Sequence, residues 1–442
     1  MTLTKPDTTT SLIGKWKTYP AYKDSGMEWL GEIPEHWEVR RLKYIARLSY
    51  GDSLPADTRA EGETTVFGSN GPVGFHSEPN TLAPALVIGR KGSFGKINFS
   101  DHPCFAIDTT YFIDSRNSKE NLRWLFYSLS LLKLDSISED SAIPGLSREL
   151  TEKQWLPVMP PSEQCAIATF LDRETAKINT LIAKKERLVE LLQEKRAALI
   201  SQAVTKGLDP AVPMNDSGVD WLGEIPASWT INKIGIECIV KARLGWKGLK
   251  ASEYVDEGYI FLATPNIKGR EIDFQNVNYI TAERYFESPE IMLKVGDVLI
   301  AKDGSTLGIT SVIRYLPNPA TVNSSIAVIR PDQSLDSIFL YWFLSANYIQ
   351  GFIQRMKDGM GVPHLFQADL RKFVVLVPPL TEQQAIANYL DHETAKIDAL
   401  ISRIREGIEK LKEYSTALIS AAVTGKIDVR QAIGNDRDTS SS

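Results

Sequence analysis

Cysteine and histidine are scarce in this sequence. Its 442 residues include three cysteines, Cys104, Cys165 and Cys238, and five dispersed histidines. No Cys-x-x-Cys pair occurs, and no histidines stand at the spacing of metal ligands. Such a pattern predicts neither a disulfide framework nor a zinc site. We expect the cysteines to be small, buried hydrophobic residues.

Long apolar runs are also missing. No stretch approaches the roughly 18 uninterrupted apolar residues of a membrane-spanning helix. Charged residues stand near the N-terminus, where a secretion signal needs an apolar segment. The chain is therefore predicted to be cytoplasmic and to have no membrane partner.

Catalytic motifs are a third class of missing features. The sequence has no Gly-x-x-x-x-Gly-Lys-Ser/Thr loop, no Gly-rich strand-to-helix turn followed by an acidic residue, and no Asn/Asp-Pro-Pro-aromatic motif of amino-methyltransferases. The letters DGST at 303–306 resemble a nucleophile turn, but the spacing suggests no histidine partner for it. We predict that the chain is not an enzyme and holds no cofactor or metal of its own.

Charge of either sign is not in large excess. The 55 acidic and 50 basic residues give a formal net charge of −5, which argues against coating nucleic acid by bulk attraction. Local basic surfaces remain possible, because phosphate contacts need nearby cations and not a basic total. With 43% hydrophobic residues, the composition is that of a globular protein, and the length predicts two to four units.

The sequence does contain a repeat of itself. Residues 24–37 read DSGMEWLGEIPEHW, and residues 216–229 read DSGVDWLGEIPASW. Residues 163–182 read EQCAIATFLDRETAKINTLI, and residues 382–401 read EQQAIANYLDHETAKIDALI, each copy following a Pro-Pro pair. The order of opening signature, variable region and conserved segment therefore occurs twice.

The conserved segments predict one long helix in each copy. Alternate steps of four and three residues visit a mostly apolar series that no proline interrupts. The series are Ile167, Leu171, Glu174, Ile178, Leu181, Lys185, Leu188, Leu192, Lys195 and Leu199, and Ile386, Leu390, Glu393, Ile397, Leu400, Ile404, Gly407, Leu411, Tyr414 and Leu418. About forty residues make a rod of roughly 60 Å, too long for one small domain to cover. We expect the two helices to pack antiparallel, the alternative being that each lies on its own domain.

The variable regions, about 38–160 and 230–377, predict mixed α+β globules. Short β-branched or aromatic runs alternate there with Gly, Asn and Pro turns. Expected strands are 65–67, 86–88, 111–113, 259–262, 297–301 and 325–329, and expected helices are 121–132 and 335–356. The Thr- and Ser-rich ends, 1–20 and 429–442, are predicted to be disordered tails.

These motifs resemble those of the specificity subunits of type I restriction–modification systems, the HsdS family. The likeness covers about residues 20–428. It rests on the SGxxWLGEIPxxW signatures at 25–37 and 217–229, PGLS at 144–147, PPSEQ at 160–164, PPLTEQQ at 378–384 and FGSNGPVGF at 67–75. The second half lacks the GSNG loop and has ATPNI at 263–267 in a comparable place. The two halves are therefore expected to read different sequences.

The resemblance implies an α+β fold with two target-recognition domains, separated by two long antiparallel coiled-coil helices in a pseudo-twofold repeat. The expected divisions are a tail at 1–20, the first recognition domain at 21–160, a central conserved helix at 161–207, the second recognition domain at 208–377, a C-terminal conserved helix at 378–428 and a tail at 429–442. A pseudo-twofold chain would present its two recognition domains at a fixed distance, which DNA converts into base pairs at ~3.4 Å each.

The implied function is that of a DNA-specificity subunit, which reads a bipartite site with a fixed spacer on double-stranded DNA. The implied partners are two adenine-N6 methyltransferase subunits and up to two restriction/translocase subunits. S-adenosylmethionine, ATP and Mg²⁺ would then belong to those partners. Two other functions stay open: a coiled-coil scaffold without DNA specificity, and an inactive spare specificity chain.

Candidate DNA contacts stand in Gly-rich loops that carry basic or amide side chains, where backbone can approach phosphate closely. In the first half these are Ser69, Asn70, His76, Arg90, Lys91 and Ser93; in the second they are Lys241, Arg243, Trp246, Lys247, Asn266, Lys268, Lys302 and Ser305. GRKGS at 89–93 and AKDGS at 301–305 occupy similar points of the two halves. Each residue has the alternative of being a solvated surface group. The signature residues Trp29, Trp37, Trp221 and Trp229 are expected to pack at helix–domain junctions and not to stack on bases.

Overall fold

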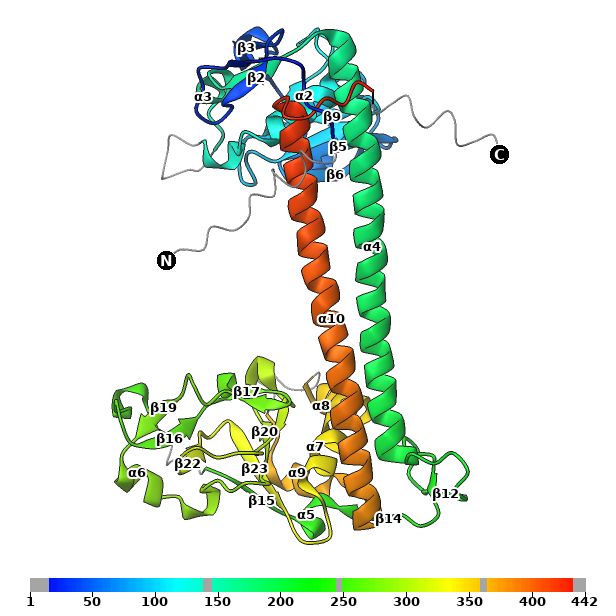
Figure 1. The fold of residues 1–442 in the computed structure, drawn as a ribbon. Helices are drawn as coiled ribbons and strands as arrows, with labels where there is room; N and C mark the ends of the chain where they lie inside the picture. The colour runs from blue at the N-terminus through cyan, green and yellow to red at the C-terminus, as the bar shows by residue number, and fades with distance from the viewer. Residues whose placement is uncertain (1–15, 138–144, 244–248, 358–363, 432–442) are drawn as a thin grey trace. The chain divides into compact units, whose positions relative to one another are not determined.

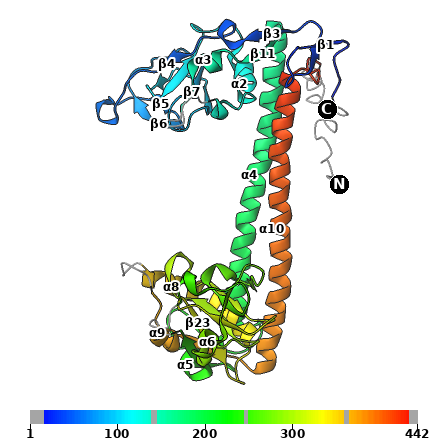
Figure 2. The ribbon, with the colours of Figure 1, turned by 90° about the vertical axis from the view of Figure 1, so that its left-hand side faces the viewer.

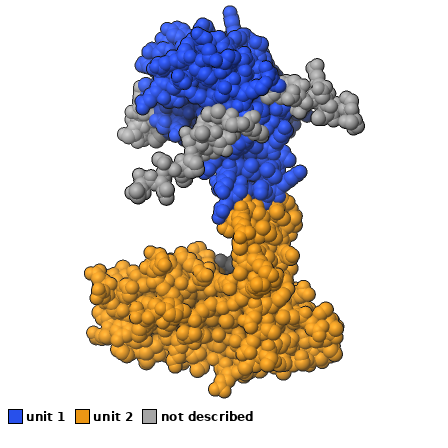
Figure 3. All heavy atoms as spheres, viewed as in Figure 1, with its two compact units in different colours: residues 1–186, 406–442 blue, residues 187–405 orange. Residues whose placement is uncertain are grey.

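The chain folds into two compact units, drawn in Figure 1 and coloured by unit in Figure 3. The computed structural model describes residues 16–137, 145–243, 249–357 and 364–431. Unit 1 comprises residues 1–186 and 406–442, and unit 2 comprises residues 187–405. The boundaries fall inside the two long helices, so each unit contains one variable region and a part of both helices.

Unit 1 is built around two small sheets. The larger sheet has the strand order β4-β10-β7-β8 and is antiparallel throughout, and in the smaller sheet β5 pairs antiparallel with β6 and parallel with β9. The strands are β1 (Tyr22–Asp24), β2 (Glu32–Pro34), β3 (Glu38–Arg41), β4 (Ser49–Tyr50), β5 (Thr64–Gly68), β6 (Gly71–His76), β7 (Ala85–Gly89), β8 (Ile97–Ser100), β9 (Phe105–Ala106), β10 (Thr110–Ile113) and β11 (Trp155–Val158). Strand β7 is buried along its whole length, as its continuous apolar run predicts.

Unit 2 repeats the strand order of both sheets and adds a two-stranded hairpin of β17 and β18. Its larger sheet has the order β15-β23-β20-β21, and in its smaller sheet β16 pairs antiparallel with β19 and parallel with β22. The strands are β12 (Met214–Asp216), β13 (Glu224–Pro226), β14 (Thr230–Lys233), β15 (Cys238–Ala242), β16 (Tyr259–Leu262), β17 (Ile267–Lys268), β18 (Glu271–Ile272), β19 (Asn278–Ile280), β20 (Val298–Ala301), β21 (Thr310–Val312), β22 (Ala320–Val322), β23 (Ile326–Pro331) and β24 (Val374–Val377). All six predicted strands lie within or overlap strands of these two units.

Short helices cover the sheets. Unit 1 has α2 (Leu122–Ser130) and α3 (Arg148–Glu152), and unit 2 has α5 (Ile234–Glu237), α6 (Ala282–Phe286), α7 (Ser337–Ser345), α8 (Asn347–Lys357) and α9 (Gln367–Lys372). The single helix predicted at 335–356 is two helices, because Ala346 is extended, with φ −67° and ψ 146°. The side chain of Gln350 stabilises the break by donating a hydrogen bond to the Leu344 carbonyl at 2.8 Å.

The long helices are α4 (Pro161–Lys206) and α10 (Leu380–Val423). In unit 1 the start of α4 shares a core with the end of α10, including Ile167 and Leu418. In unit 2 the end of α4 shares a core with the start of α10, including Ile200 and Ile386. The two helices therefore run antiparallel within each unit, as predicted (Figures 1 and 2). In the described part of the chain, no helix is both long enough and apolar enough to cross a membrane.

The buried face of the long helices differs from the predicted series in its middle. Leu181, Leu188 and Leu400 are 43–45% exposed, whereas Val189 and Ile401 are buried. An α-helix has 3.6 residues per turn, so a straight helix drifts by about 20° for every seven residues relative to a strict heptad series. The strict alternation of four and three steps was therefore wrong at Leu181, Leu188 and Leu400, whereas Ile404 and Leu418 of the second series are buried as predicted.

The predicted tails at 1–20 and 429–442 are too long on the sides that adjoin the fold. Tyr19 and Val429 are buried in the core of unit 1, and the Asp428 amide donates a hydrogen bond to the Lys17 carbonyl at 2.7 Å. The apolar residues in these otherwise polar segments have a partner surface in unit 1, which the local composition does not reveal. Residues 1–15 and 432–442 lie outside the described residues.

Candidate functional site

The repeated signature and the repeated helix motif meet at one junction in each unit. The indole Nε1 of Trp37 donates to Oε2 of Glu163 at 3.0 Å, and Trp229 donates to Oε2 of Glu382 at the same distance. Both indoles are at most 5% exposed, so they pack the junction as predicted. Trp29, in contrast, is 47% exposed.

The glutamine that follows each of these glutamates is hydrogen-bonded to the start of a helix in the variable region of its unit. Gln164 accepts a hydrogen bond from the amide of Asn121, the residue that caps α2, at 2.9 Å. Gln383 accepts one from the amide of Asp336, which caps α7, at 2.7 Å. The conserved helix motif therefore positions the variable region, and its polar residues are engaged inside the fold.

Two corresponding loops follow β7 in unit 1 and β20 in unit 2, and we call them the strand-end loops (89–95 and 301–308). Each is closed by one hydrogen bond between glycine and the last strand residue, from Gly95 to Gly89 at 2.8 Å and from Gly308 to Ala301 at 2.9 Å. The prediction that these two segments are equivalent is confirmed by this shared geometry. The second loop is one residue longer.

A second segment faces each strand-end loop. In unit 1 the amide of Leu146 donates to the Arg90 carbonyl at 2.9 Å, and in unit 2 the amide of Leu365 donates to the Lys302 carbonyl, also at 2.9 Å. Isolated β-bridges join Lys91 to Gly145 and Asp303 to His364. The residues at corresponding positions of the two loops can therefore be compared one by one.

In unit 1 the strand-end loop carries an arginine between two tyrosines. The Arg90 guanidinium lies 5.1 Å from the ring centroid of Tyr50 and 5.9 Å from that of Tyr111. The guanidinium of Arg148 lies 5.6 Å from the ring centroid of Tyr50, which is half exposed. Burial and the neighbouring Tyr50 raise the pKa of Tyr111 to about 12, so its phenol stays protonated at neutral pH. The sequence had not indicated Tyr50 or Arg148, although Arg148 directly follows the PGLS motif.

Most of the other predicted contact residues of unit 1 lie near this loop. The Ser69 hydroxyl donates to the Thr109 carbonyl at 2.8 Å, the same oxygen that accepts from the Arg90 amide. Asn70 is exposed and accepts hydrogen bonds from the ammonium of Lys96, a cation that the prediction missed. Lys91 and Ser93 are exposed on the loop itself. His76 stands at the far end of β6, where its Nδ1 accepts from the Ala60 amide at 3.1 Å.

Three predicted contact residues of unit 2 are instead buried. Arg243 is 2% exposed, and its guanidinium donates to the Val322 carbonyl and to two hydroxyls, while burial lowers its pKa. Asn266 is 5% exposed and closes its own turn by accepting from the Ala263 amide at 2.8 Å. Lys302 is 6% exposed, and burial lowers its pKa although Asp303 opposes this effect. The sequence predicts exposed polar side chains in these segments, and for these three residues the prediction is wrong because the fold of unit 2 buries them.

The remaining predicted residues of unit 2 are spread apart. Ser305 is exposed on the strand-end loop, Lys268 is exposed on β17, and Lys241 is half-buried on β15. Trp246 and Lys247 lie outside the described residues.

The sequence reasoning missed His364, which the fold brings to the strand-end loop of unit 2. Its Nδ1 is hydrogen-bonded to the carboxylate of Asp303, and its ring contacts that of Phe366 at a centroid distance of 4.4 Å. The search for a histidine partner of the DGST segment relied on spacing along the chain and failed for that reason. The repeat contained a usable signal, because PHL at 363–365 follows PGL at 144–146 by the same 219 residues that separate the two helix motifs. The described side chains of Ser305 and His364 share no hydrogen bond, and His364 Nδ1 is bonded to Asp303 instead.

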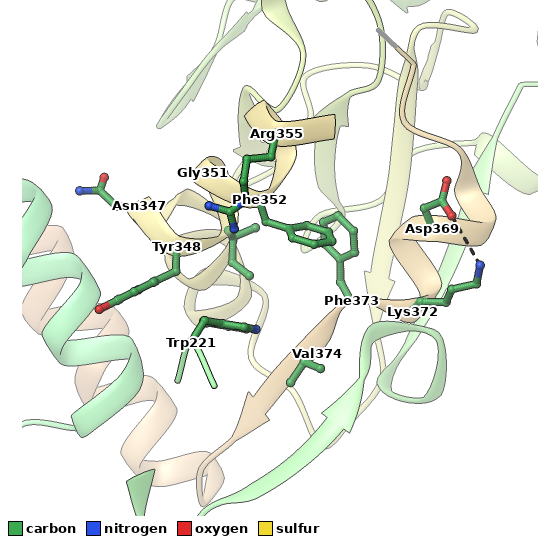
Figure 4. A pocket seen from close by; sticks show the side chains of 11 residues that line it. Trp221, Asn347, Tyr348, Gly351, Phe352, Arg355, Asp369, Lys372, Phe373 and Val374 are labelled. Atoms are coloured by element: carbon green, nitrogen blue, oxygen red, sulfur yellow. Dashed lines mark ion pairs between the residues drawn. The ribbon is translucent and has the colours of Figure 1, made fainter. Parts of the chain in front are cut away.

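Unit 2 also contains an aromatic cavity of about 590 Å³ (Figure 4). Trp221 and Tyr348 line one side, with ring centroids 5.8 Å apart, and Phe352 packs on Phe373 at 5.2 Å. The cavity shares no lining residue with the strand-end loop or its facing segment. The half-buried Trp221 therefore packs against α8 and has no partner at the loop.

Comparison with known proteins gives one consistent result. The chain matches the family described as type I restriction modification DNA specificity domain over residues 34–191 and 251–410. It is 25% identical over 324 residues to the type I restriction enzyme MjaVIII specificity subunit of Methanocaldococcus jannaschii, covering 72% of this chain and 73% of that protein. It is 26% identical over 435 residues to the putative type I restriction enzyme MjaX specificity subunit of the same organism, covering 91% and 96%.

The fold is shared with a solved structure. A chain from a structure that describes the complex assembly and conformational transition of a type I R-M system matches with a TM-score of 0.63 and 17% identity, covering 88% of this chain and 98% of that one. At this identity the likeness concerns the arrangement of helices and strands.

Proposed function

Because the chain belongs to the family of type I restriction–modification DNA specificity proteins, we propose that its two units each read one half of a bipartite DNA site with a fixed spacer. As a member of this family it is a specificity subunit and not the catalytic one. It would direct adenine-N6 methyltransferase subunits to the site that its two halves select.

One observation carries this proposal: the same loop occurs twice with different side chains. Unit 1 presents Arg90 and Lys91, which suit phosphate oxygens or the acceptors of guanine. Unit 2 has a buried Lys302 and the Asp303–His364 pair at the corresponding positions. Loops with corresponding backbone contacts but different side chains are what two recognition domains with different half-sites require.

The helices supply surfaces for partners. Leu188, Leu191 and Leu400 are each 44–45% exposed in unit 2. Burial of a leucine side chain against a partner would be favourable, because it removes apolar surface from water. We propose that two methyltransferase subunits cover such surfaces and that up to two restriction/translocase subunits join them. S-adenosylmethionine, ATP and Mg²⁺ would then bind to those partners. The chain alone is expected to bind DNA weakly and to transfer no methyl group.

Exchange of one recognition domain tests the proposal. Residues 38–160 would be replaced by those of another family member, and methylated adenines would be mapped across the host genome with and without the exchange. We expect one half-site to change and the other to persist. A change in both half-sites, or methylation by the purified chain alone, would contradict the proposal. Methylation without sequence preference would favour a scaffold, and intact folding without host methylation would favour a spare chain.

The spacer can be tested separately. Insertion of four residues near Lys185 in α4 adds about one helical turn, or ~6 Å, and keeps the apolar face within ~40° of its direction. At ~3.4 Å per base pair, we expect the unread spacer to lengthen by about one or two base pairs. An unchanged spacer would show that the helices do not set it.

A further inference from the structure

In unit 2 a histidine–carboxylate pair joins the strand-end loop to its facing segment, and it has no counterpart in unit 1. Asp303 and His364 are joined by a backbone bridge and by their side chains. At the corresponding bridge of unit 1 stand Lys91 and Gly145, so neither partner of the pair is repeated. The pair is therefore a feature of the second half alone, at the position where the first half presents its cations.

The contact with Asp303 determines which imidazole nitrogen can accept a hydrogen bond. An ionised carboxylate can only accept hydrogen bonds, so the Nδ1 that meets it carries the proton. In the neutral ring with this tautomer, Nε2 is an acceptor. The His364 side chain is 32% exposed, and Phe366, which packs edge-on against its ring, is 51% exposed. Asp303 and Phe366 thus hold the ring on two sides, while part of it stays open to solvent.

We propose that His364 determines the base at one position of the second half-site, by accepting a hydrogen bond at Nε2 from the exocyclic amino group of adenine or cytosine. Both bases present such a donor in the major groove, whereas guanine and thymine present acceptors there. Asp303 is a positioning residue that fixes the tautomer and the ring plane. The inference rests on the proposed function, because it assumes that the strand-end loop approaches DNA.

The charge of the surroundings favours a base contact over a phosphate contact. Lys302 beside Asp303 is buried, and its ammonium is not presented at the surface. Asp303 itself is 30% exposed and would repel a phosphate oxygen at short range. In unit 1 the equivalent loop has Arg90 and Lys91 and no acidic residue, which suits the phosphate backbone.

The test is a methylation map of variants of the full chain, assembled with its methyltransferase partners. With His364→Ala, we expect one position of the second half-site to lose its preference for adenine or cytosine by about 5- to 10-fold, while the first half-site keeps its bases. Asp303→Ala should relax the same position to a smaller extent, because the ring remains but is no longer oriented. His364→Gln should restore part of the preference, since its amide oxygen can also accept.

Lys91→Ala is the matched control in unit 1. It is expected to lower methylation at all sites without relaxing any position of the second half-site. A fall in overall methylation by His364→Ala with unchanged base preference would overturn the inference, and so would guanine or thymine at the affected position. If His364→Ala unfolds the chain, His364→Gln and Asp303→Ala carry the test, with thermal unfolding measured in parallel. A wild-type map without a bipartite motif would refute the proposed function itself, whereas a bipartite motif that His364 variants leave intact would refute this inference alone.

Discussion

Replacement of Gly425 by alanine tests whether the end of α10 closes unit 1. Gly425 follows the last turn of α10 with φ +73°, a left-handed conformation that glycine adopts without strain. A Cβ at this position would lie 2.6 Å from Cγ of Pro34, with Cδ of the same ring closer still, and 3.0 Å from the Trp37 indole. Pro34 and Trp37 belong to the opening signature, near the other end of the chain.

The expected loss of stability has two parts. A left-handed conformation costs an alanine roughly 1–2 kcal/mol. Forcing a methyl group against the rigid proline ring and a fully buried indole adds about 1–3 kcal/mol, because neither group can rotate away. Together we expect Gly425→Ala to lower the free energy of unfolding of unit 1 by about 2–5 kcal/mol.

Gly207 at the end of α4 is the matched control. Its φ is +78°, but a Cβ there would first meet Oε1 of Glu382 at 3.0 Å, the far end of a flexible side chain. Gly207→Ala should therefore cost little more than the conformational part, roughly 1–2 kcal/mol. The difference between the two variants isolates the packing contribution of the signature.

Hydrogen exchange measured by mass spectrometry distinguishes the units. Gly425→Ala should speed exchange at 22–37 in unit 1 and leave 214–229 in unit 2 near the wild-type rate, whereas Gly207→Ala should do the reverse to a smaller extent. Equal effects of the two variants, or protection of 22–37 that Gly425→Ala does not change, would refute the argued contact.

Four further variants each change a single side chain. Glu382→Gln should lower the stability of unit 2 by about 1 kcal/mol in denaturant titration, because the indole hydrogen bond loses its charged acceptor. Although burial alone would raise the pKa of Asp114, hydrogen bonds from Arg116 and from backbone amides hold it below its usual range. The ionised Asp114 therefore stabilises the folded state above about pH 4, and this stabilisation is lost as the pH falls through the lowered pKa. With Asp114→Asn, the free energy of unfolding should depend less on pH in the acidic range. Arg90→Ala should weaken DNA binding by the assembled complex with little change in melting temperature, whereas Arg243→Ala should lower the melting temperature because it removes a buried group whose three partners remain.

The sequence alone determined the repeat and its direct consequences. Two copies of a signature and a helix motif predicted two equivalent halves, and the sheets that both units contain indeed have the same strand order. The apolar residues at 86–88 and 298–301 lie in buried central strands, because a strand that is covered on both faces needs apolar side chains on both faces. The pairing of the two long helices was also predictable, because one small domain cannot cover an apolar face of this length.

The tertiary structure alone decided which polar residues remain outside. Arg243 and Arg90 both stand in segments rich in small residues, yet one fills the interior and the other lies between two tyrosine rings. His364 meets Asp303 across 61 residues of chain, through a bridge between a loop and a segment that share no local pattern. The unit boundaries fall within α4 and α10 because the two ends of each helix pack with different variable regions. Burial and proximity depend on what packs against a residue, and that partner is set by the fold of distant segments and not by the residue's own neighbours in the sequence.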